Sequence, residues 1–313
     1  MPLDPHLAAV LQSFAESGAS PLHEGTPSES RVVYRTLTHG SLTPEQVTPV
    51  GSVEDAIVPG ASGPLKARIY RPNGRGPFPT VTFFHGGGWV VGDLDTHDNM
   101  CRGLCRGSQS VVVSVDYRLA PEHRFPAAVE DAVEAAKWVA ANALELGGSD
   151  VVALAGDSAG GNLAAVVAQE LRRLEIPLAG QFLVYPSVDQ PGAGHASMEE
   201  NAHGYFLEKE LMAWFYSHYV GNWKEPKNVR LAPIQAVSLA SLPPAVIVTA
   251  EFDPLRDEGE AYGDALQAAG VYADVRRYAG MIHGFFDMGR WSPAAQQAIE
   301  ESTQRFGEIL RRL

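Results

Sequence analysis

Along most of this chain, short runs of apolar residues alternate with longer segments whose apolar positions recur every three or four residues. A short run rich in Val, Ile, Phe or Tyr predicts a buried strand, and the wider spacing predicts an amphipathic helix. The runs that we expect to be strands are 53–58, 65–70, 80–84, 111–115, 151–155, 178–185, 245–250 and 273–278. The segments that we expect to be helices between them are 96–107, 126–146, 161–171, 256–269 and 294–313.

This alternation favours an α/β fold, because strands separated by helices form a mostly parallel sheet with helices on both faces. The first two strands are the exception, since a short turn rich in Pro and Gly joins them and predicts an antiparallel pair. The last strand, 273–278, is a candidate edge of the sheet. An open edge can pair with a second copy of the chain, so a homodimer is possible.

Two stretches break the alternation. Residues 1–50 contain an apolar helical pattern near the start, a loop rich in Gly, Pro and Ser, and a second short helix near 28–37. Residues 187–232 contain no expected strand but a helix over 204–219, whose apolar face carries Leu207, Leu211, Trp214, Phe215, His218 and Tyr219. We expect these two stretches to form a helical cap above an α/β domain made of 51–186 and 233–313. Such a stripe is more often the core of a cap than a ligand surface.

Composition narrows the range of partners. The 313 residues are 45% hydrophobic and 19% charged, and 24 basic against 37 acidic residues give a net charge of -13. That charge argues against nucleic acid or an anionic membrane as a partner. No apolar run is long enough for a membrane span, and the N-terminus does not resemble a signal peptide, so we expect a cytoplasmic protein. Cys101 and Cys105 are expected to be reduced packing residues, with no metal site.

The stretch 156–160 carries the first chemical signal. It reads Gly-Asp-Ser-Ala-Gly and lies between the expected strand 151–155 and the expected helix 161–171. A serine at the apex of a strand-to-helix turn, with Gly two places to either side, is the pattern of a nucleophile elbow. Glycine is needed there because strand and helix approach too closely for a side chain. The same five residues also arise by chance, but the flanking elements favour Ser158 as a nucleophile.

A serine nucleophile needs a base, and the base needs a carboxylate that orients it. In proteins with a nucleophile elbow, the carboxylate and then the histidine follow the serine along the chain. Asp253 comes directly after the strand 245–250 and before a proline that keeps it out of the next helix. Glu251 and Asp257 are rivals by proximity. Asp257 falls in the first turn of a helix, where an acidic residue is favoured by the dipole alone. We therefore favour Asp253.

The base follows from chain order. Of ten histidines, only His195, His203, His218 and His283 come after Ser158, and the first three lie in the expected cap. His283 follows the strand 273–278 through an expected loop, 279–282, at the edge of the sheet where the elbow lies. We therefore expect His283 to be the base.

A run of three glycines supplies candidate donors for an oxyanion. His85, Gly86, Gly87, Gly88 and Trp89 follow the strand 80–84. Glycines let the backbone turn its N–H groups toward a developing negative charge, and in esterases they act with the N–H of the residue after the nucleophile. We expect Gly87, Gly88 and Ala159 to be the donors, Gly86 to make the turn, and His85 to anchor the loop. Taken alone, the run could be only a tight turn.

These motifs together resemble the hormone-sensitive-lipase family of α/β-hydrolases, in its bacterial carboxylesterase branch. The residues that carry the resemblance are 85–89, 156–161, 253–255 and 283–285, with 116–122 as a further match that we interpret as a structural brace of the glycine turn. The resemblance implies an eight-stranded, mostly parallel sheet with a two-part helical cap. It also implies hydrolysis of short- to medium-chain acyl esters by Ser158, Asp253 and His283, without a cofactor.

Other functions on the same fold stay open. Gibberellin receptors resemble this family but lack the catalytic histidine and bind a small molecule under the cap, and an amidase, a peptidase or a lipase could use the same three residues. The partner that we expect is a small ester. The residues expected to contact it are Trp89, Asp157, Tyr185, Phe206, Leu207 and Trp214.

Overall fold

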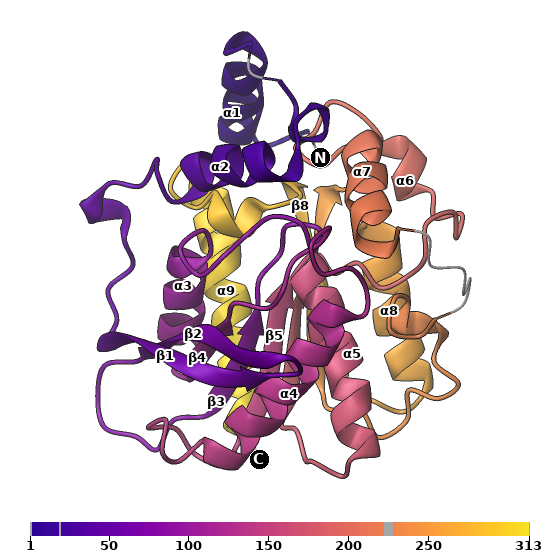
Figure 1. Cartoon of the computed structure of the whole chain (residues 1–313). Coiled ribbons are helices and arrows are strands. Elements are labelled where there is room, and N and C mark those ends of the chain that lie inside the picture. The colour runs from indigo at the N-terminus through magenta and orange to yellow at the C-terminus, as the bar shows by residue number, and fades with distance from the viewer. Residues whose placement is uncertain (1, 19, 222–227, 313) are drawn as a thin grey trace.

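The fold is seen in a computed structural model that describes residues 2–18, 20–221 and 228–312. Eight strands form one sheet in the order β1-β2-β4-β3-β5-β6-β7-β8 (Figure 1). Their bounds are β1 Ser52–Gly60, β2 Gly63–Arg71, β3 Thr80–Phe84, β4 Val111–Val115, β5 Val152–Asp157, β6 Gly180–Val184, β7 Ala245–Phe252 and β8 Ala273–Ile282. β2 pairs antiparallel with β1 and β4, and the other neighbours are parallel. The α/β fold and the eight-stranded, mostly parallel sheet are confirmed.

Helices cover both faces of the sheet (Figure 1). On one face lie α3 Asp98–Ser108 and α9 Pro293–Leu310, and on the other lie α4 Ala127–Asn142, α5 Ala159–Arg173 and α8 Arg256–Ala268. The central strands β3, β4, β5 and β6 are buried along their whole length, which explains why they are continuous apolar runs. Two hydrophobic cores result, one on each side of the sheet.

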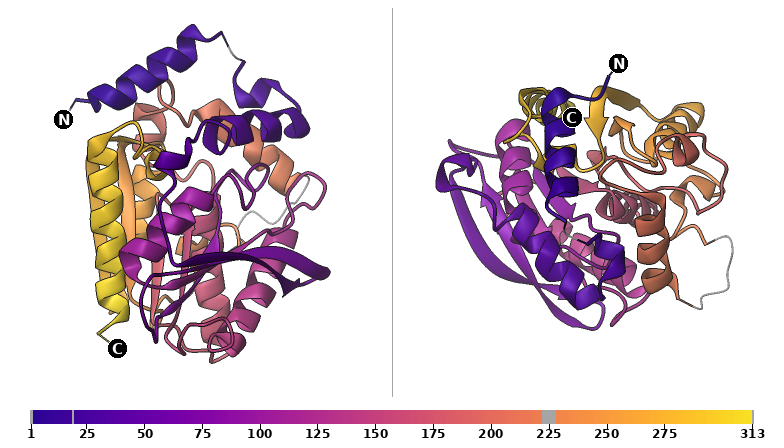
Figure 2. Two further views of the ribbon diagram at one scale, coloured as in Figure 1. Left: turned by 90° about the vertical axis from the view of Figure 1, so that its left-hand side faces the viewer. Right: turned by 90° about the horizontal axis from the view of Figure 1, so that it is seen from above.

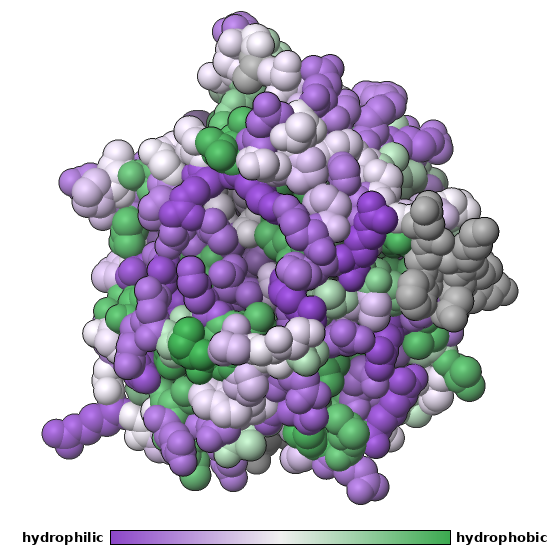
Figure 3. All heavy atoms as spheres, in the orientation of Figure 1, coloured by the Kyte–Doolittle hydropathy of each residue, from purple (hydrophilic) through white to green (hydrophobic). Residues whose placement is uncertain are grey.

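Four more helices lie beyond the carboxyl ends of the parallel strands (Figure 2). They are α1 Pro5–Glu16, α2 Pro27–Thr38, α6 Ser197–Glu200 and α7 Lys209–Val220, and short 3₁₀ turns occupy Leu22–Glu24, Pro44–Gln46, Pro233–Gln235 and Phe285–Asp287. Thr26 and Glu29 form a capping box at the start of α2. None of the described helices combines the length and the apolar character that a bilayer crossing requires. Polar residues predominate on the face in Figure 3, with hydrophobic residues in separate patches.

The structure corrects several predicted boundaries. β8 continues to Ile282, so residues 279–282 are strand and not loop. The predicted helix over 204–219 begins only at Lys209, because the backbone of Glu208 is extended, with φ of -112° and ψ of 157°. Pro126 precedes α4 as its N-cap residue instead of opening it. β8 is the edge strand, as expected. Part of the predicted cap, residues 222–227, lies outside the described residues.

Candidate active site

Ser158 sits at the turn between β5 and α5 in a strained conformation. Its φ is 53° and its ψ is -117°, and α5 begins at the next residue, Ala159. A Cβ atom at Gly156 would collide with the carbonyl oxygen of Gly160, and one at Gly160 would collide with that of Phe84. The crowding explains why glycine occupies both positions, and the geometry is that of a nucleophile elbow.

Three of the predicted residues form a hydrogen-bonded relay. His283 Nε2 lies 3.0 Å from Ser158 Oγ, and His283 Nδ1 lies 2.8 Å from Asp253 Oδ2. Asp253 is fully buried, and its other oxygen accepts the Leu255 N–H at 2.9 Å. A carboxylate at Nδ1 favours the imidazole tautomer with its proton on that nitrogen, which leaves Nε2 free to accept a proton from the serine. The ring of Tyr185 packs against the imidazole, with 4.4 Å between the ring centroids.

The rival acids have other partners. Glu251 accepts the Gly280 N–H at 2.7 Å, and Asp257 accepts the Ser197 N–H at 2.8 Å. The other candidate histidines also lie elsewhere in the described structure. His195 and His203 approach carboxylates of Asp189 and Glu210, and His218 packs edge-on against Trp214. Of the four, His283 alone contacts Ser158 within the described residues.

The glycine turn after β3 faces Ser158. Gly87 and Gly88 have φ values of 105° and 59°, which a residue with a side chain seldom adopts. A Cβ atom would collide with the Val91 carbonyl at the first position and with the Phe215 ring at the second. Within the described residues neither amide has a protein acceptor. The amide of Ala159 opens a helix, where intrahelical acceptors are lacking. These three N–H groups could bind an oxyanion.

The peptide of Gly86 is held on both sides. Its N–H donates to Asp157 Oδ1 at 2.8 Å, and its carbonyl lies 2.7 Å from His85 Nδ1. Burial lowers the pKa of His85 to about 4, so its ring is neutral and donates from Nδ1. The Tyr117 hydroxyl donates to the His85 carbonyl at 2.7 Å. His85 therefore anchors the loop, and the segment 116–122 braces it, as the sequence suggests.

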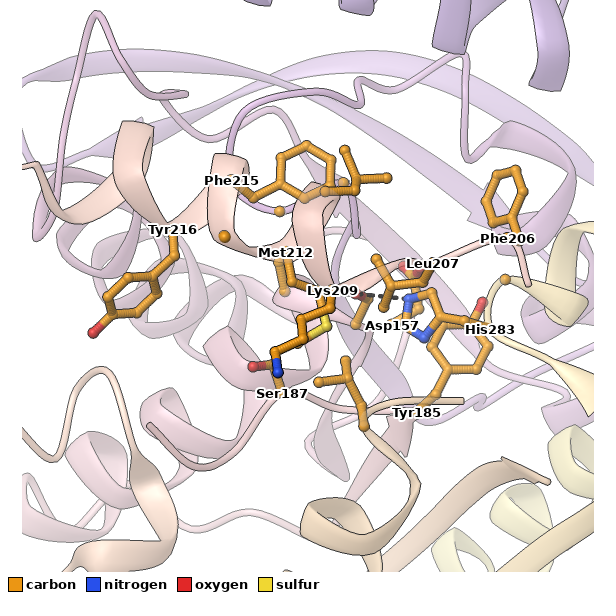
Figure 4. Close-up of a pocket in the computed structure, with 18 of the residues that line it drawn as sticks. Asp157, Tyr185, Ser187, Phe206, Leu207, Lys209, Met212, Phe215, Tyr216 and His283 are labelled. Atoms are coloured by element: carbon orange, nitrogen blue, oxygen red, sulfur yellow. Dashed lines mark hydrogen bonds between the residues drawn. The ribbon is translucent and has the colours of Figure 1, made fainter. Parts of the chain in front are cut away.

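A cavity of about 690 Å³ opens above Ser158. Five of the six expected substrate contacts line it, and Figure 4 shows four of them: Asp157, Tyr185, Phe206 and Leu207. The fifth, Trp89, stacks at 4.3 Å on Tyr219 of α7. Trp214 is the exception. It packs edge-on against Phe215 and does not belong to the cavity wall in the described structure.

Several lining residues were not predicted as substrate contacts. Phe14 comes from α1, Tyr34 and Leu37 come from α2, and Met212 and Tyr216 come from α7. Helical periodicity shows that such residues face inward, but it does not separate a cavity wall from a packed core. Phe215 was predicted to lie on the buried stripe of the cap, and it also faces the glycine turn.

One cluster could hold a cation. His203, Glu208 and Glu210 place their ligand atoms within 4.8 Å of one another. His203 and Glu210 are exposed, and none of the three belongs to the cavity wall, so the cluster is separate from the relay at Ser158. Exposed groups of this kind are common without an ion, and we assign no role to it.

Comparison with known proteins agrees with this geometry. Residues 81–287 match the family described as alpha/beta hydrolase fold. The chain belongs to this family, in the hormone-sensitive-lipase-like group that its motifs resemble.

The relatives are esterases by name. The chain is 46% identical to carboxylic ester hydrolase LipN of Mycobacterium tuberculosis, over 79% of this chain and 68% of that protein. It is 38% identical to carboxylesterase NlhH of the same organism, over 95% and 92%. The solved structure of a hyperthermophilic esterase from the archaeon Pyrobaculum calidifontis has a TM-score of 0.93 and 42% sequence identity, and the match covers 99% of both chains.

Proposed function

We propose that the chain hydrolyses short- to medium-chain acyl esters through an acyl-enzyme intermediate on Ser158. Its coarser class, a carboxylic-ester hydrolase, follows from its family and from the relatives named above. The observation that carries the finer proposal is the Ser158–His283–Asp253 relay at the base of the cavity. A serine with this relay has the base that a hydroxyl nucleophile requires.

The first half of the reaction forms the acyl-enzyme. Ser158 Oγ attacks the ester carbonyl carbon while its proton passes to His283 Nε2, and Asp253 stabilises the imidazolium that forms. The N–H groups of Gly87, Gly88 and Ala159 bind the tetrahedral oxyanion. When the carbon–oxygen bond to the leaving group breaks, His283 returns the proton to the departing alcohol.

The second half repeats these steps with water. His283 takes a proton from the water as its oxygen attacks the acyl carbon, and the same amides bind the second oxyanion. The bond to Ser158 Oγ then breaks, the serine regains its proton, and the carboxylic acid leaves. No cofactor is needed for either half, since each proton moves between substrate, water and His283.

The wall of the cavity supports an apolar acyl group. Apolar side chains from the cap helices belong to this wall, among them Phe14, Leu37, Met198, Leu211 and Met212. A cavity of about 690 Å³ falls within the usual range for small-molecule sites and suits a short or medium chain better than a triglyceride.

The test is a serine substitution with a matched control. Ser158→Ala should lower kcat for p-nitrophenyl butyrate by about 10⁴-fold or more. Ser187→Ala, at another serine of the cavity wall, should retain activity within about tenfold. A fluorophosphonate should label the wild type and Ser187→Ala but not Ser158→Ala. Full turnover by Ser158→Ala would overturn the proposal, and ligand binding without labelling would instead indicate a receptor.

The remaining assignments are proposals of the same kind. We propose that 51–186 and 233–313 form the catalytic domain and that 1–50 and 187–232 form its cap. The placement of α1, α2, α6 and α7 above the sheet supports that division (Figure 2). The open edge at β8 supports a homodimer. A cytoplasmic setting is proposed from the sequence alone.

A further inference from the structure

A second imidazole lies buried behind the glycine turn. His97 is 2% exposed, immediately precedes α3, and does not belong to the wall of the substrate cavity. Its ring packs among the rings of Tyr34, Phe83 and His85, with centroid distances of 6.2, 6.3 and 5.3 Å. Its Nε2 lies 3.5 Å from Oδ1 of Asp157, the residue before the nucleophile. The reaction steps described above give this histidine no part.

The hydrogen bonds around Thr96 fix which nitrogen of His97 carries a proton. Thr96 Oγ1 lies 2.9 Å from His97 Nδ1, accepts the Asp93 N–H at 2.8 Å, and can donate to the Asp93 carbonyl at 2.9 Å. If the hydroxyl donates to that carbonyl, Nδ1 must carry a proton in order to hydrogen-bond to the hydroxyl oxygen. Nε2 must then also carry a proton, because its lone pair would otherwise face the Asp157 carboxylate, and the ring is an imidazolium. If the hydroxyl donates to Nδ1, the ring proton is on Nε2. In both cases an Nε2–H points at Asp157.

Asp157 in turn sets the position of the glycine turn. The oxygen that faces His97, Oδ1, also accepts the Gly86 N–H at 2.8 Å. The fit is close, since a Cβ atom at Gly86 would collide with the other oxygen of the same carboxylate. Any rotation of the Asp157 side chain would therefore move the Gly86 peptide and, with it, the amides of Gly87 and Gly88.

We propose that His97 is a positioning residue for the oxyanion hole and acts through Asp157 and Gly86. Asp157 is 4% exposed and directly precedes Ser158, beside which the oxyanion of the substrate forms. Without His97, the carboxylate would keep the Gly86 N–H as a donor but lose the imidazole on its other side, and its charge would oppose a neighbouring oxyanion more strongly. The Nε2–H of His97 both fixes the carboxylate and offsets its charge. The inference rests on the proposed function, because it concerns the same reaction.

The test compares side chains that keep or remove the donor. His97→Gln can place an amide N–H near the position of Nε2, His97→Leu has no donor, and His97→Asn is too short to reach Asp157. We expect His97→Leu and His97→Asn to lower kcat for p-nitrophenyl butyrate about 10- to 100-fold, below the loss of a direct oxyanion donor. Their KM should change by less than about threefold, because ground-state binding does not use this network. His97→Gln should recover most of the rate, and His39→Gln, at an exposed histidine, should match the wild type.

A trifluoromethyl ketone separates positioning from general packing. Such an inhibitor forms a hemiketal oxyanion on the serine, so its Ki should rise by the same factor by which kcat/KM falls in His97→Leu and His97→Asn. Wild-type kcat in His97→Asn would overturn the proposal, and so would a Gln variant as slow as the Leu variant. If His97→Leu does not fold, the Asn and Gln pair decides. An active Ser158→Ala would refute the proposed function itself, whereas an inactive Ser158→Ala beside fully active His97 variants would refute only this inference.

Discussion

Glu258 is a buried carboxyl group of the cavity wall that takes no part in the proposed reaction. It is 3% exposed, and one of its oxygens accepts the Val188 N–H at 2.7 Å and approaches the Asp189 N–H at 3.4 Å. Burial raises the pKa of Glu258 to about 8, and the two amides offset only part of that effect. This side chain fixes the loop that follows β6, beside the elbow. Because its pKa is about 8, the carboxyl group holds a proton below that pH.

That proton makes stability depend on pH. The carboxyl has an ordinary pKa of 4.5 and a folded pKa of about 8, so the folded chain binds the proton more tightly. Stability should therefore fall as pH rises from about 4.5 to 8 and carry the full penalty above that range. Glu258→Gln cannot ionise. The Tm of this variant minus the Tm of the wild type should therefore be larger at about pH 9 than at about pH 5. Differential scanning calorimetry measures the Tm of both proteins. An equal difference in Tm at the two pH values would contradict the raised pKa of Glu258.

Residues of the site differ in how far the sequence reveals them. Ser158, Asp253 and His283 could be predicted because the fold fixes their order and their places after strands. The places of His97 and Glu258 near the site could not, because they depend on contacts between distant segments, such as the hydrogen bond between Gly86 and Asp157, 71 positions apart. Trp214 shares its helix with true cavity residues, and the helical pattern could not tell which direction each ring takes.

At the scale of elements, arginines hold α2 over the cavity. The guanidinium of Arg31 donates to the carbonyls of Val90 and Ala120 at 2.8 Å and pairs with both oxygens of Glu122. Arg290 donates to two carbonyls at the end of α2, those of Leu37 and Thr38. The helix that supplies Tyr34 to the cavity is thus tied to the loop after the glycine turn and to the segment before α9.

Removing Arg31 should loosen this helix. In Arg31→Met, three backbone and side-chain partners lose their donor, so we expect faster proteolysis in the loop that follows α2 and a KM for p-nitrophenyl butyrate raised about 3- to 10-fold. Limited proteolysis read by mass spectrometry and steady-state kinetics measure the two effects. Arg75→Met, at an exposed arginine, is the matched control. Identical cleavage rates in both variants would show that Arg31 does not hold α2.

The same pair responds to acid. Hydrogen bonds from Arg31 lower the pKa of Glu122 to about 2. The stability that the Arg31–Glu122 pair adds is therefore present above about pH 4.5 and is lost as the pH falls toward 2. The effect of Arg31→Met on proteolysis should shrink over that range with an acid-tolerant protease. Glu122 is 55% exposed, and solvent screening makes its share smaller than that of the buried carbonyls.

Element identities were more predictable than their ends. Every predicted strand exists, and the central ones were clearest because buried parallel strands are continuous apolar runs. The last strand was predicted to end at residue 278, but residues 279–281 of β8, with Gly280 at φ of 76°, only bulge opposite one residue of β7, and pairing resumes at Ile282. A glycine with positive φ therefore does not end a strand when it lies within a bulge of that strand.

At the scale of the whole molecule, charge should select among substrates. The chain carries a net charge of -13, and acidic side chains such as Glu199 and Asp189 line the cavity. A negative field slows the approach of anions, and salt screens it. The kcat/KM for the anionic p-nitrophenyl hemisuccinate should rise about 3- to 10-fold between about 10 and 500 mM NaCl, with a much smaller change for p-nitrophenyl butyrate. Stopped-flow or plate kinetics suffice, and equal salt dependence of both esters would contradict this view.

The crowding around Ser158 limits which parts of the chain can vary. At Gly156 and Gly160 a single added methyl group meets backbone atoms, which cannot rotate away as a side chain can. Any residue other than glycine at these two positions would therefore push Ser158 out of its place, because backbone atoms fill the space. A mutagenesis library aimed at new esters should leave 156–160 untouched and concentrate on cap residues of the cavity wall, such as Phe206, Leu207, Leu211, Met212 and Tyr216.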